Sequence, residues 1–329
     1  MAASSWNGKI WISGMDDFEP CYISTNSGFT WQSHGGGSTA SVACSADGNV
    51  MGCINNNSIS TNLGANWFSP PVSPAFEGEG QTVFPADGNI WMVISDYGMS
   101  ISTNEGNSWA TNSVPGTNDA DAAVSADGTK IAIIQRFPSF SSESTSYLPG
   151  WIYVSTNSGS SWLRTSAPSN YWTSIACSAD GNTLVASAGI FTGYLDGNGP
   201  LTTSSGGIYT SSDGGNTWVS NSVPDVNWYS VSCSADGSKM VAADDDAPGA
   251  IYTSYSTPSL QLNISAATAN PAFSWVLPAT NFVLQESSNV MTPNWVTLTN
   301  VPSLNLANLR EQLMLSATNS GEFFRLISQ

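Results

Sequence analysis

Oxygen-bearing side chains recur at one place in a repeated pattern, eight residues after a glycine that follows Asp or Asn. Residues of this kind are Asp16, Asn56, Asp96 and Asp245, and two more acids, Glu79 and Asp119, stand where a strand of the pattern begins. Carboxylates that face one another need a cation or raised pKa values. Ca²⁺ prefers a flexible shell of Asp, Glu and Asn oxygens. We therefore expect these six residues to bind Ca²⁺ around a central channel; the alternative is solvated acids on exposed loops.

A bound divalent cation would make hydrolysis the natural reaction, because it polarises a carbonyl or phosphoryl oxygen and lowers the pKa of its water. His34, the single histidine of the chain, is then the candidate general base. Asp121 is a candidate catalytic carboxylate, and Arg136 could hold an anionic substrate group. The alternatives are an ordinary exposed histidine and a solvated arginine.

Hydrolysis of a glycoside needs no metal, only two suitably spaced carboxylates. The candidates for such a pair are Asp96, Asp119, Asp121 and Asp245. A substrate of this class includes sugar rings, which stack on aromatic side chains. Trp172, Trp228, Tyr229 and Tyr97 are the predicted substrate contacts, and packing inside the fold is the alternative for each aromatic residue.

Two short patterns alternate along residues 1–258 and define the elements that must position these side chains. Asp-Gly or Asn-Gly, usually after Ala, occurs between short apolar runs, which is a strong hairpin signal. Its copies are 7–8, 47–48, 87–88, 127–128, 180–181 and 236–237. A box of the form Ser-x-Asn/Asp-x-Gly-x-x-Trp falls between them, at 24–31, 60–67, 102–109, 155–162 and 211–218. Each repeat thus predicts four antiparallel strands, A to D, with hairpins at A–B and C–D, which is a propeller blade.

The box resembles the Asp-box of sialidase-like, BNR-repeat β-propellers. That resemblance implies that the Asn or Asp caps a turn, that the Gly takes a positive φ, and that the Trp wedges between strands. Sialidase activity itself is not expected, because the family grips its substrate with three arginines. Residues 1–258 contain only Arg136 and Arg164.

Six Asp-Gly or Asn-Gly turns predict six blades over residues 1–258, with five or seven as alternatives. Loops B–C and D–A then share one end of the ring, where propellers as a class hold their ligands, and the B–C loops at 137–150 and 190–207 are long. Residues 259–329 differ in composition and predict a small C-terminal β-sandwich module. The fold class is therefore all-β, a propeller followed by a sandwich.

Composition limits the partners. Lys and Arg number 7 against 24 Asp and Glu, a formal net charge of −17, which excludes a nucleic-acid phosphate backbone. No apolar run is long enough to cross a bilayer, so membrane insertion is not expected. Low Lys content and abundant Ser, Thr and Asn are typical of an exported protein. We expect a secreted or periplasmic monomer. Because Met1–Trp6 has no signal-peptide pattern, we expect either that the native leader is absent from this chain or that the chain is a fragment of a longer one.

Five cysteines leave at least one thiol unpaired. Cys44, Cys177 and Cys233 occupy the same place in three repeats and are expected to be small core residues. The leading functional prediction is a hydrolase, with Ca²⁺, for an ester, phosphoester, lactone or glycoside. The alternative is a non-catalytic propeller that binds a glycan or a protein.

Overall fold

A computed structural model gives the fold, and every regular element that it describes is a β-strand. The described residues are 2–5, 7–14, 20–35, 41–53, 58–69, 80–86, 88–95, 98–104, 106–115, 121–135, 149–190, 192–194, 201–246, 248–255, 262–265, 272–276, 282–289, 291–305, 309–315 and 323–328. None of them belongs to a helix long and apolar enough to cross a membrane.

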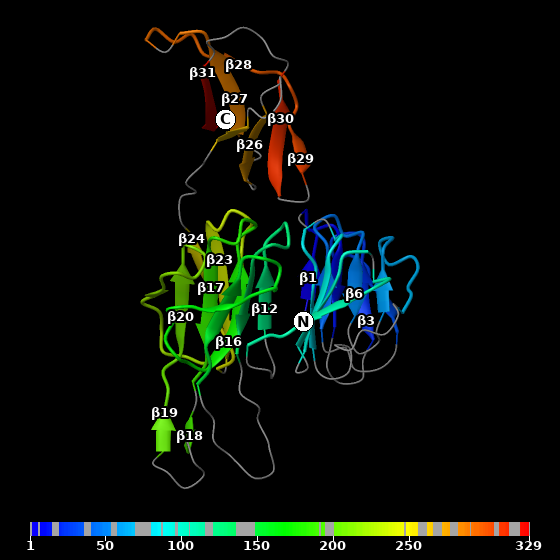
Figure 1. The fold of residues 1–329 in the computed structure, drawn as a ribbon, viewed down its shortest axis with the longest axis vertical. Coiled ribbons are helices and arrows are strands. Elements are labelled where there is room, and N and C mark those ends of the chain that lie inside the picture. Colours follow the sequence, from blue (N-terminus) through cyan, green and yellow to red (C-terminus); the bar gives the residue numbers. More distant parts are fainter. Residues whose placement is uncertain are drawn as a thin grey trace.

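The described residues up to 255 form six antiparallel sheets of three or four strands around a central axis (Figure 1). Sheet one contains β1 (Ala2–Ser4), β2 (Trp11–Ser13), β3 (Cys21–Ser24) and β4 (Gln32–His34). Sheet two contains β5 (Val42–Cys44), β6 (Met51–Cys53) and β7 (Ser58–Ser60). Sheet three contains β8 (Gly80–Val83), β9 (Trp91–Ser95), β10 (Gly98–Ser102) and β11 (Ala110–Asn112).

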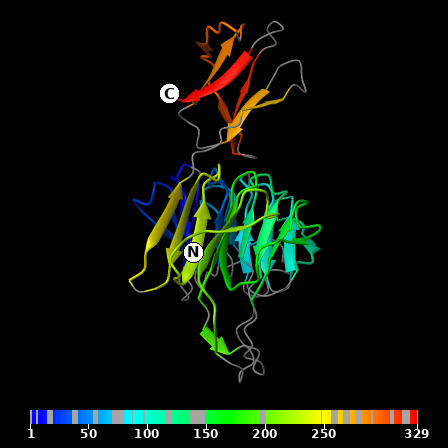
Figure 2. The ribbon, with the colours of Figure 1, turned by 90° about the vertical axis from the view of Figure 1, so that its left-hand side faces the viewer.

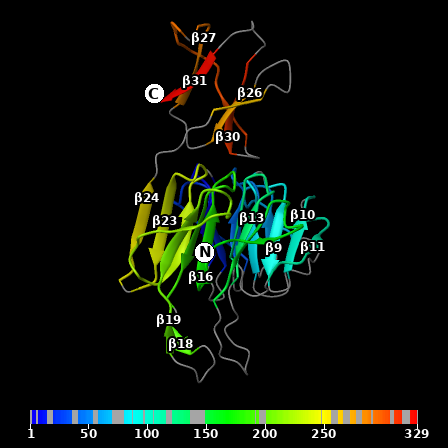
Figure 3. The same cartoon turned by 60° about the vertical axis from the view of Figure 1, so that its left-hand side comes forward.

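The second half of the ring repeats the same meander. Sheet four contains β12 (Asp121–Val124), β13 (Ile131–Ile134), β14 (Ile152–Ser155) and β15 (Leu163–Arg164). Sheet five contains β16 (Trp172–Cys177), β17 (Leu184–Ala188), β20 (Gly207–Ser211) and β21 (Val219–Ser220). Sheet six contains β22 (Trp228–Cys233), β23 (Lys239–Asp244) and β24 (Ile251–Tyr255). The chain is thus an all-β propeller, and its sheets follow one another around the axis (Figures 2 and 3).

The Asp-Gly turns form because the side chains of a serine and an aspartate accept hydrogen bonds from the backbone N–H groups of the turn. In the turn after β16, Ser178 Oγ–H donates to Asp180 Oδ1 at 2.6 Å, and the same oxygen accepts the Asn182 N–H at 2.9 Å. The serine hydroxyl accepts the Thr183 N–H at 3.0 Å. The glycine that follows has a φ of 64°. These bonds connect residues within six positions, so the turn is encoded locally.

The box turns use the same chemistry with Asn in the place of Asp. Ser24 Oγ accepts the Gly28 N–H at 2.9 Å, and Asn26 Oδ1 accepts the Thr30 N–H at 2.9 Å. Trp31 Nε1–H donates to the Gly28 carbonyl at 3.0 Å, and Gly28 has a φ of 84°. The Asn therefore caps the turn and the Gly has a positive φ, as predicted, whereas the indole of Trp31 bonds within its own turn and is 44% exposed.

The alanines of the Ala-Asp-Gly turns join neighbouring sheets into a ladder around the axis. The N–H of each of the first four alanines donates to the carbonyl of the alanine in the next sheet, at 2.8 to 3.1 Å. The series runs in chain order through Ala46, Ala86, Ala126, Ala179 and Ala235. Their side chains form a cluster against which Leu309 packs. We call this end of the ring the turn end.

Residues after 262 form two further sheets that share one core. One sheet has the order β25 (Asn263–Ser265), β26 (Ala272–Val276), β30 (Arg310–Met314) and β29 (Ser303–Asn305). The other has the order β28 (Val296–Thr297), β27 (Phe282–Ser287) and β31 (Phe323–Ser328). Phe273, Trp275, Leu284 and Leu313 are buried between them. This C-terminal unit lies over the turn end (Figures 1 and 2), which agrees with the contact of Leu309.

Replacing Asp180 by alanine should destabilise the protein in a pH-dependent way. Burial alone would raise the pKa of the Asp180 carboxyl, but hydrogen bonds from Ser178 and Asn182, together with Lys130, hold it below its usual value. A lowered folded-state pKa contributes stability that is present above the unfolded pKa and is lost as the pH falls through the folded one. Because the carboxyl is half-exposed, we expect a loss of about 1–2 kcal/mol at pH 7.

Urea denaturation of both proteins at pH 7 and near pH 3 measures this difference, which should shrink at the lower pH. A difference that is equal at both pH values would show that the Asp180 charge is not what stabilises the turn.

The three repeated cysteines, Cys44, Cys177 and Cys233, are free and partly buried at the ends of their strands. Burial raises the pKa of each thiol to about 12, with smaller contributions from neighbouring groups. At pH 8 only about one thiol in ten thousand is then a thiolate, the reactive form. The native protein should therefore react with a thiol reagent only in traces.

Denaturation without reductant should expose three thiols, and denaturation with reductant all five. Fast titration of native protein would contradict the burial of these side chains.

Candidate functional site

The end of the ring opposite the turn end carries the loops between second and third strands, and we call it the loop end. Its longest described connection joins β17 to β20 and contains a hairpin of β18 (Thr192–Tyr194) and β19 (Leu201–Thr203). This hairpin projects away from the ring, on the side opposite the C-terminal unit (Figures 1 and 3). The C-terminal unit and this hairpin therefore lie at opposite ends of the ring.

Several predicted site residues lie outside the described residues. These are the predicted metal ligands Asp16, Asn56, Glu79, Asp96 and Asp119, the predicted anion-binding Arg136 and the predicted substrate contact Tyr97. In the described part of the chain, no three His, Cys, Asp or Glu side chains lie together in an arrangement that could hold a metal ion.

Asp121 holds two sheets together. Its Oδ2 accepts the Ile175 N–H at 2.9 Å, from β16 of sheet five, and its Oδ1 accepts the Ala122 N–H at 3.0 Å. Both carboxylate oxygens are therefore engaged with backbone, which gives Asp121 a clear structural role between β12 and β16.

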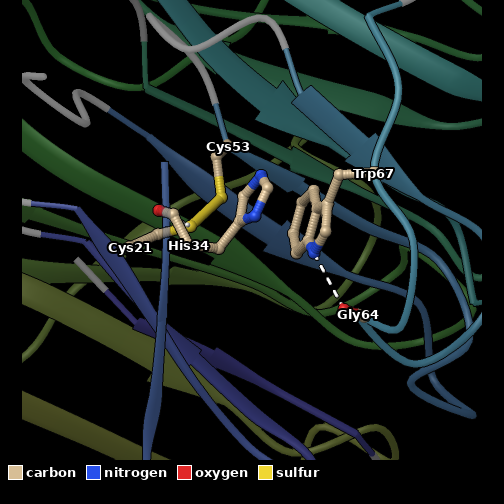
Figure 4. Close-up of a disulfide and its surroundings, with 5 residues drawn as sticks. All are labelled: Cys21, His34, Cys53, Gly64 and Trp67. Carbon is tan, nitrogen blue, oxygen red and sulfur yellow. Dashed lines mark hydrogen bonds between the residues drawn. A yellow bond between two sulfur atoms is a disulfide. The ribbon is translucent and has the colours of Figure 1, made fainter. Parts of the chain in front are cut away.

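His34, the predicted general base, lies at the end of a strand. It is the last residue of β4, the outer strand of sheet one, where it pairs with Cys21. Its ring stacks on Trp67, with centroids 4.1 Å apart and planes 12° from parallel (Figure 4). Burial lowers the pKa of His34, which favours a neutral ring. Asp121 lies on the innermost strand of sheet four, so the described structure gives no shared site for these two residues.

A disulfide lies beside this stacked pair and was not predicted. It joins Cys21 of β3 to Cys53 of β6, so it links sheet one to sheet two (Figure 4). The two cysteines occupy different places in the repeat, so the periodic pattern gave no signal for their pairing. The odd cysteine count remains consistent with free thiols elsewhere.

Trp172 and Trp228 are packing residues, which corrects the prediction that they contact a substrate. Both side chains are buried. Trp172 meets Tyr209 edge to face at 5.1 Å, and Trp228 meets Tyr252 at 4.8 Å. Each begins the innermost strand of its sheet and packs toward the preceding sheet, where no ligand can stack on it.

Tyr229 is directed outward by an irregularity in the strand pairing. Trp228 pairs with Asp244 and Ser230 pairs with Ala243, so Tyr229 is an extra residue in β22. A bulge of this kind re-aims a side chain. Tyr229 is 66% exposed. It is thus the one described member of the predicted aromatic contacts that presents a ring to solvent.

Asp245 lies next to this bulge, directly after the residue that pairs with Trp228. It is exposed, and its N–H donates to the Asn227 carbonyl at 2.9 Å. Its neighbours are occupied: Asp244 Oδ1 accepts the Ala250 N–H, and Asp246 Oδ2 accepts the Asn227 N–H. The Asp245 carboxylate accepts no hydrogen bond from the described residues, which leaves it available as an acceptor.

Asn227 organises this region and was missed by the sequence analysis. Its Oδ1 accepts the Ile190 N–H at 3.1 Å, across the boundary between sheets five and six. A Cβ atom at Gly189 would lie 2.6 Å from that Oδ1. Gly189 is the residue of sheet five that is equivalent to Asp245 of sheet six. A side chain does not fit at Gly189, because the next sheet approaches too closely.

No family model matches this sequence, and no curated protein matches it. Among solved structures, the chain is similar to the GH74 xyloglucanase from Xanthomonas campestris, with a TM-score of 0.52 and 14% identity. That match covers 84% of this chain and 50% of the xyloglucanase, so the chain spans half of its length. Kuenenia stuttgartiensis hydrazine synthase matches with a TM-score of 0.52, 10% identity, and coverage of 74% and 76%.

YCF48 bound to a D1 peptide matches at 15% identity and a TM-score of 0.43, covering 78% of this chain and 92% of YCF48. At identities this low, the two matches with a TM-score of 0.52 show the propeller fold alone.

Proposed function

We propose that the chain is an exported, polysaccharide-binding propeller that holds a sugar chain at its loop end. The observation that carries this proposal is that Tyr229 and Asp245 are both exposed beside the bulge of sheet six, at the adjoining ends of β22 and β23. An exposed aromatic ring stacks on the apolar face of a sugar, and an unoccupied carboxylate accepts hydrogen bonds from its hydroxyls. These are the two kinds of contact that a pyranose needs.

Two further observations support the proposal. The xyloglucanase, whose name states a polysaccharide substrate, has a similar fold at a TM-score of 0.52. The disulfide between Cys21 and Cys53 suits an oxidising compartment outside the cytosol, which is where polysaccharides are met.

Replacing Tyr229 by alanine should weaken binding to a β-glucan such as xyloglucan by about tenfold, equivalent to about 1.4 kcal/mol. Isothermal titration against a panel of soluble polysaccharides measures the affinity. Tyr255→Ala is the matched control, because Tyr255 is also an exposed tyrosine of sheet six but lies at the far end of β24. Equal affinities for the two variants would remove Tyr229 from the site, and no binding to any polysaccharide would overturn the proposal.

Hydrolysis is the second candidate function, favoured by the acids at the loop end and by the likeness to a glycoside hydrolase. Release of reducing ends from the bound polysaccharide tests it, with and without added Ca²⁺ or a chelator. Activity that is abolished by the chelator and restored by Ca²⁺ would support the Ca²⁺-assisted reaction. Activity that persists in the chelator and is lost in Asp245→Ala would support a metal-independent carboxylate pair. Binding with no turnover would leave the non-catalytic function.

A further inference from the structure

The front face of sheet six, meaning the side directed toward a following sheet, is uncovered. The comparison uses the residue that lies three positions before the box serine in each sheet. In sheets three, four and five this residue is Met99, Ile152 and Ile208, and these side chains are 1%, 0% and 7% exposed. The equivalent residue of sheet six is Ile251, three before Ser254, and it is 75% exposed. Ile208 is buried because Trp228 and Val231 of sheet six pack on it. No described sheet does the same for Ile251.

The back face of sheet one, directed toward a preceding sheet, is uncovered too. Trp11 lies three residues after its turn glycine and is 37% exposed. Its equivalents in sheets two to five are Met51, Trp91, Ile131 and Leu184, and all are at most 2% exposed.

The space around the turn glycines also shows that sheet one has no described neighbour on its back face. A Cβ atom on Gly48 would lie 2.6 Å from Ile10 of the preceding sheet, and one on Gly237 would lie 2.6 Å from Thr183. Gly88, Gly128 and Gly181 meet the preceding sheet in the same way, at 2.7 to 3.0 Å. A Cβ atom on Gly8 of sheet one would meet nothing within 4 Å.

We infer that the six sheets form an open ring, and that the seam between sheet six and sheet one is a docking surface for one further sheet of the same repeat, carried by another polypeptide. Between successive sheets, the front face of one sheet packs on the back face of the next. The front face of sheet six and the back face of sheet one each lack this partner in the described part of the chain. A single sheet that presents a back face to Ile251 and a front face to Trp11 completes both contacts at once. Its chemistry is that of sheet five, with neutral aliphatic and aromatic residues on both faces.

A second copy of this chain fits the seam less well. Its own sheets are already packed together, so it can offer only its sheet-one back face to Ile251 or its sheet-six front face to Trp11. Each such contact leaves another free face and does not close. Self-association is therefore an outcome for the test to detect.

Cysteine labelling of the full chain tests whether the seam is open. Ile251→Cys should react with a maleimide at the rate of an exposed thiol, whereas Ile208→Cys, its buried equivalent, should react at least about 100-fold more slowly. The native free thiols provide the background rate. Protection of Ile251→Cys in a monomer would mean that sheet six closes on sheet one and would overturn the inference. Protection that appears with protein concentration, together with a doubled mass in light scattering, would assign the seam to a second copy and would also overturn it.

The occupant is tested by supplying a sheet. Residues 167–222, which contain sheet five, are joined ahead of Met1, so that a repeat with both faces is available next to sheet one. We expect the added repeat to protect Ile251→Cys at least about 100-fold and to raise the melting temperature. The control fusion carries Ile208→Asp and Tyr209→Asp in the added copy only. Equal labelling and equal melting temperature of the fusion and its control would show that the seam does not accept such a sheet.

Discussion

Replacing Ile208 by alanine should lower the free energy of unfolding by about 2–4 kcal/mol, and the same replacement at Ile251 should change it by less than about 0.5 kcal/mol. The two isoleucines have the same chemistry and the same place in the repeat. Ile208 is buried between sheets five and six, so its loss leaves a cavity. Ile251 is exposed at the seam, so its loss leaves none.

Urea denaturation of both variants beside the parent measures the pair of effects. Ile152→Ala, in sheet four, is a second buried comparison and should resemble Ile208→Ala. A loss at Ile251 as large as that at Ile208 would mean that the seam is closed in solution. That outcome would contradict the proposed docking surface. It would not bear on the proposed sugar site at Tyr229, because binding of polysaccharide is measured in a different experiment.

Removal of the disulfide should cost about 3–4 kcal/mol of stability, the value for a closed loop of this length. Cys21 and Cys53 are 32 residues apart and both are buried. The bond has more than a local role, because sheet one has a neighbour on one side only. Without the disulfide, sheet one is held to the ring by its contacts with sheet two alone, and it should be the first part of the propeller to unfold.

The double variant Cys21→Ala/Cys53→Ala tests this expectation without leaving an unpaired thiol. Native-state hydrogen exchange should show β2 and β3 losing protection before β13 or β17. Cys44→Ala is the matched control, since it removes a cysteine that forms no disulfide. An unchanged unfolding midpoint in the double variant would show that the disulfide adds nothing to the sheet-one contact.

The repeated sheets were predictable because the information for each hairpin is local. The serine, the aspartate or asparagine, and the glycine of each turn bond to one another within a few residues, so their spacing is visible in the chain. The all-β propeller followed directly from counting these turns. The pairing of Cys21 with Cys53 was not predictable in this way, because it depends on how two sheets face each other.

The candidate site was predicted less well than the fold, for a reason that Trp228 and Tyr229 make plain. These neighbours were given the same role, yet one is buried and the other is exposed, because a bulge separates them. The sequence has no signal for that bulge. Asp121 was a candidate catalytic carboxylate, but its two oxygens accept backbone N–H groups, one from the next sheet. Long-range backbone contacts of this kind leave no periodic trace.

Leu309 packs on the alanine cluster at the axis of the turn end, so the C-terminal unit sits on the axis and not beside the ring. This placement gives the molecule a polarity. Any surface or partner that grips the C-terminal unit would carry the propeller with its axis pointing outward and its loop end facing away. A ligand at the loop end would then lie away from the point of attachment, and many copies held side by side would present their loop ends in the same direction.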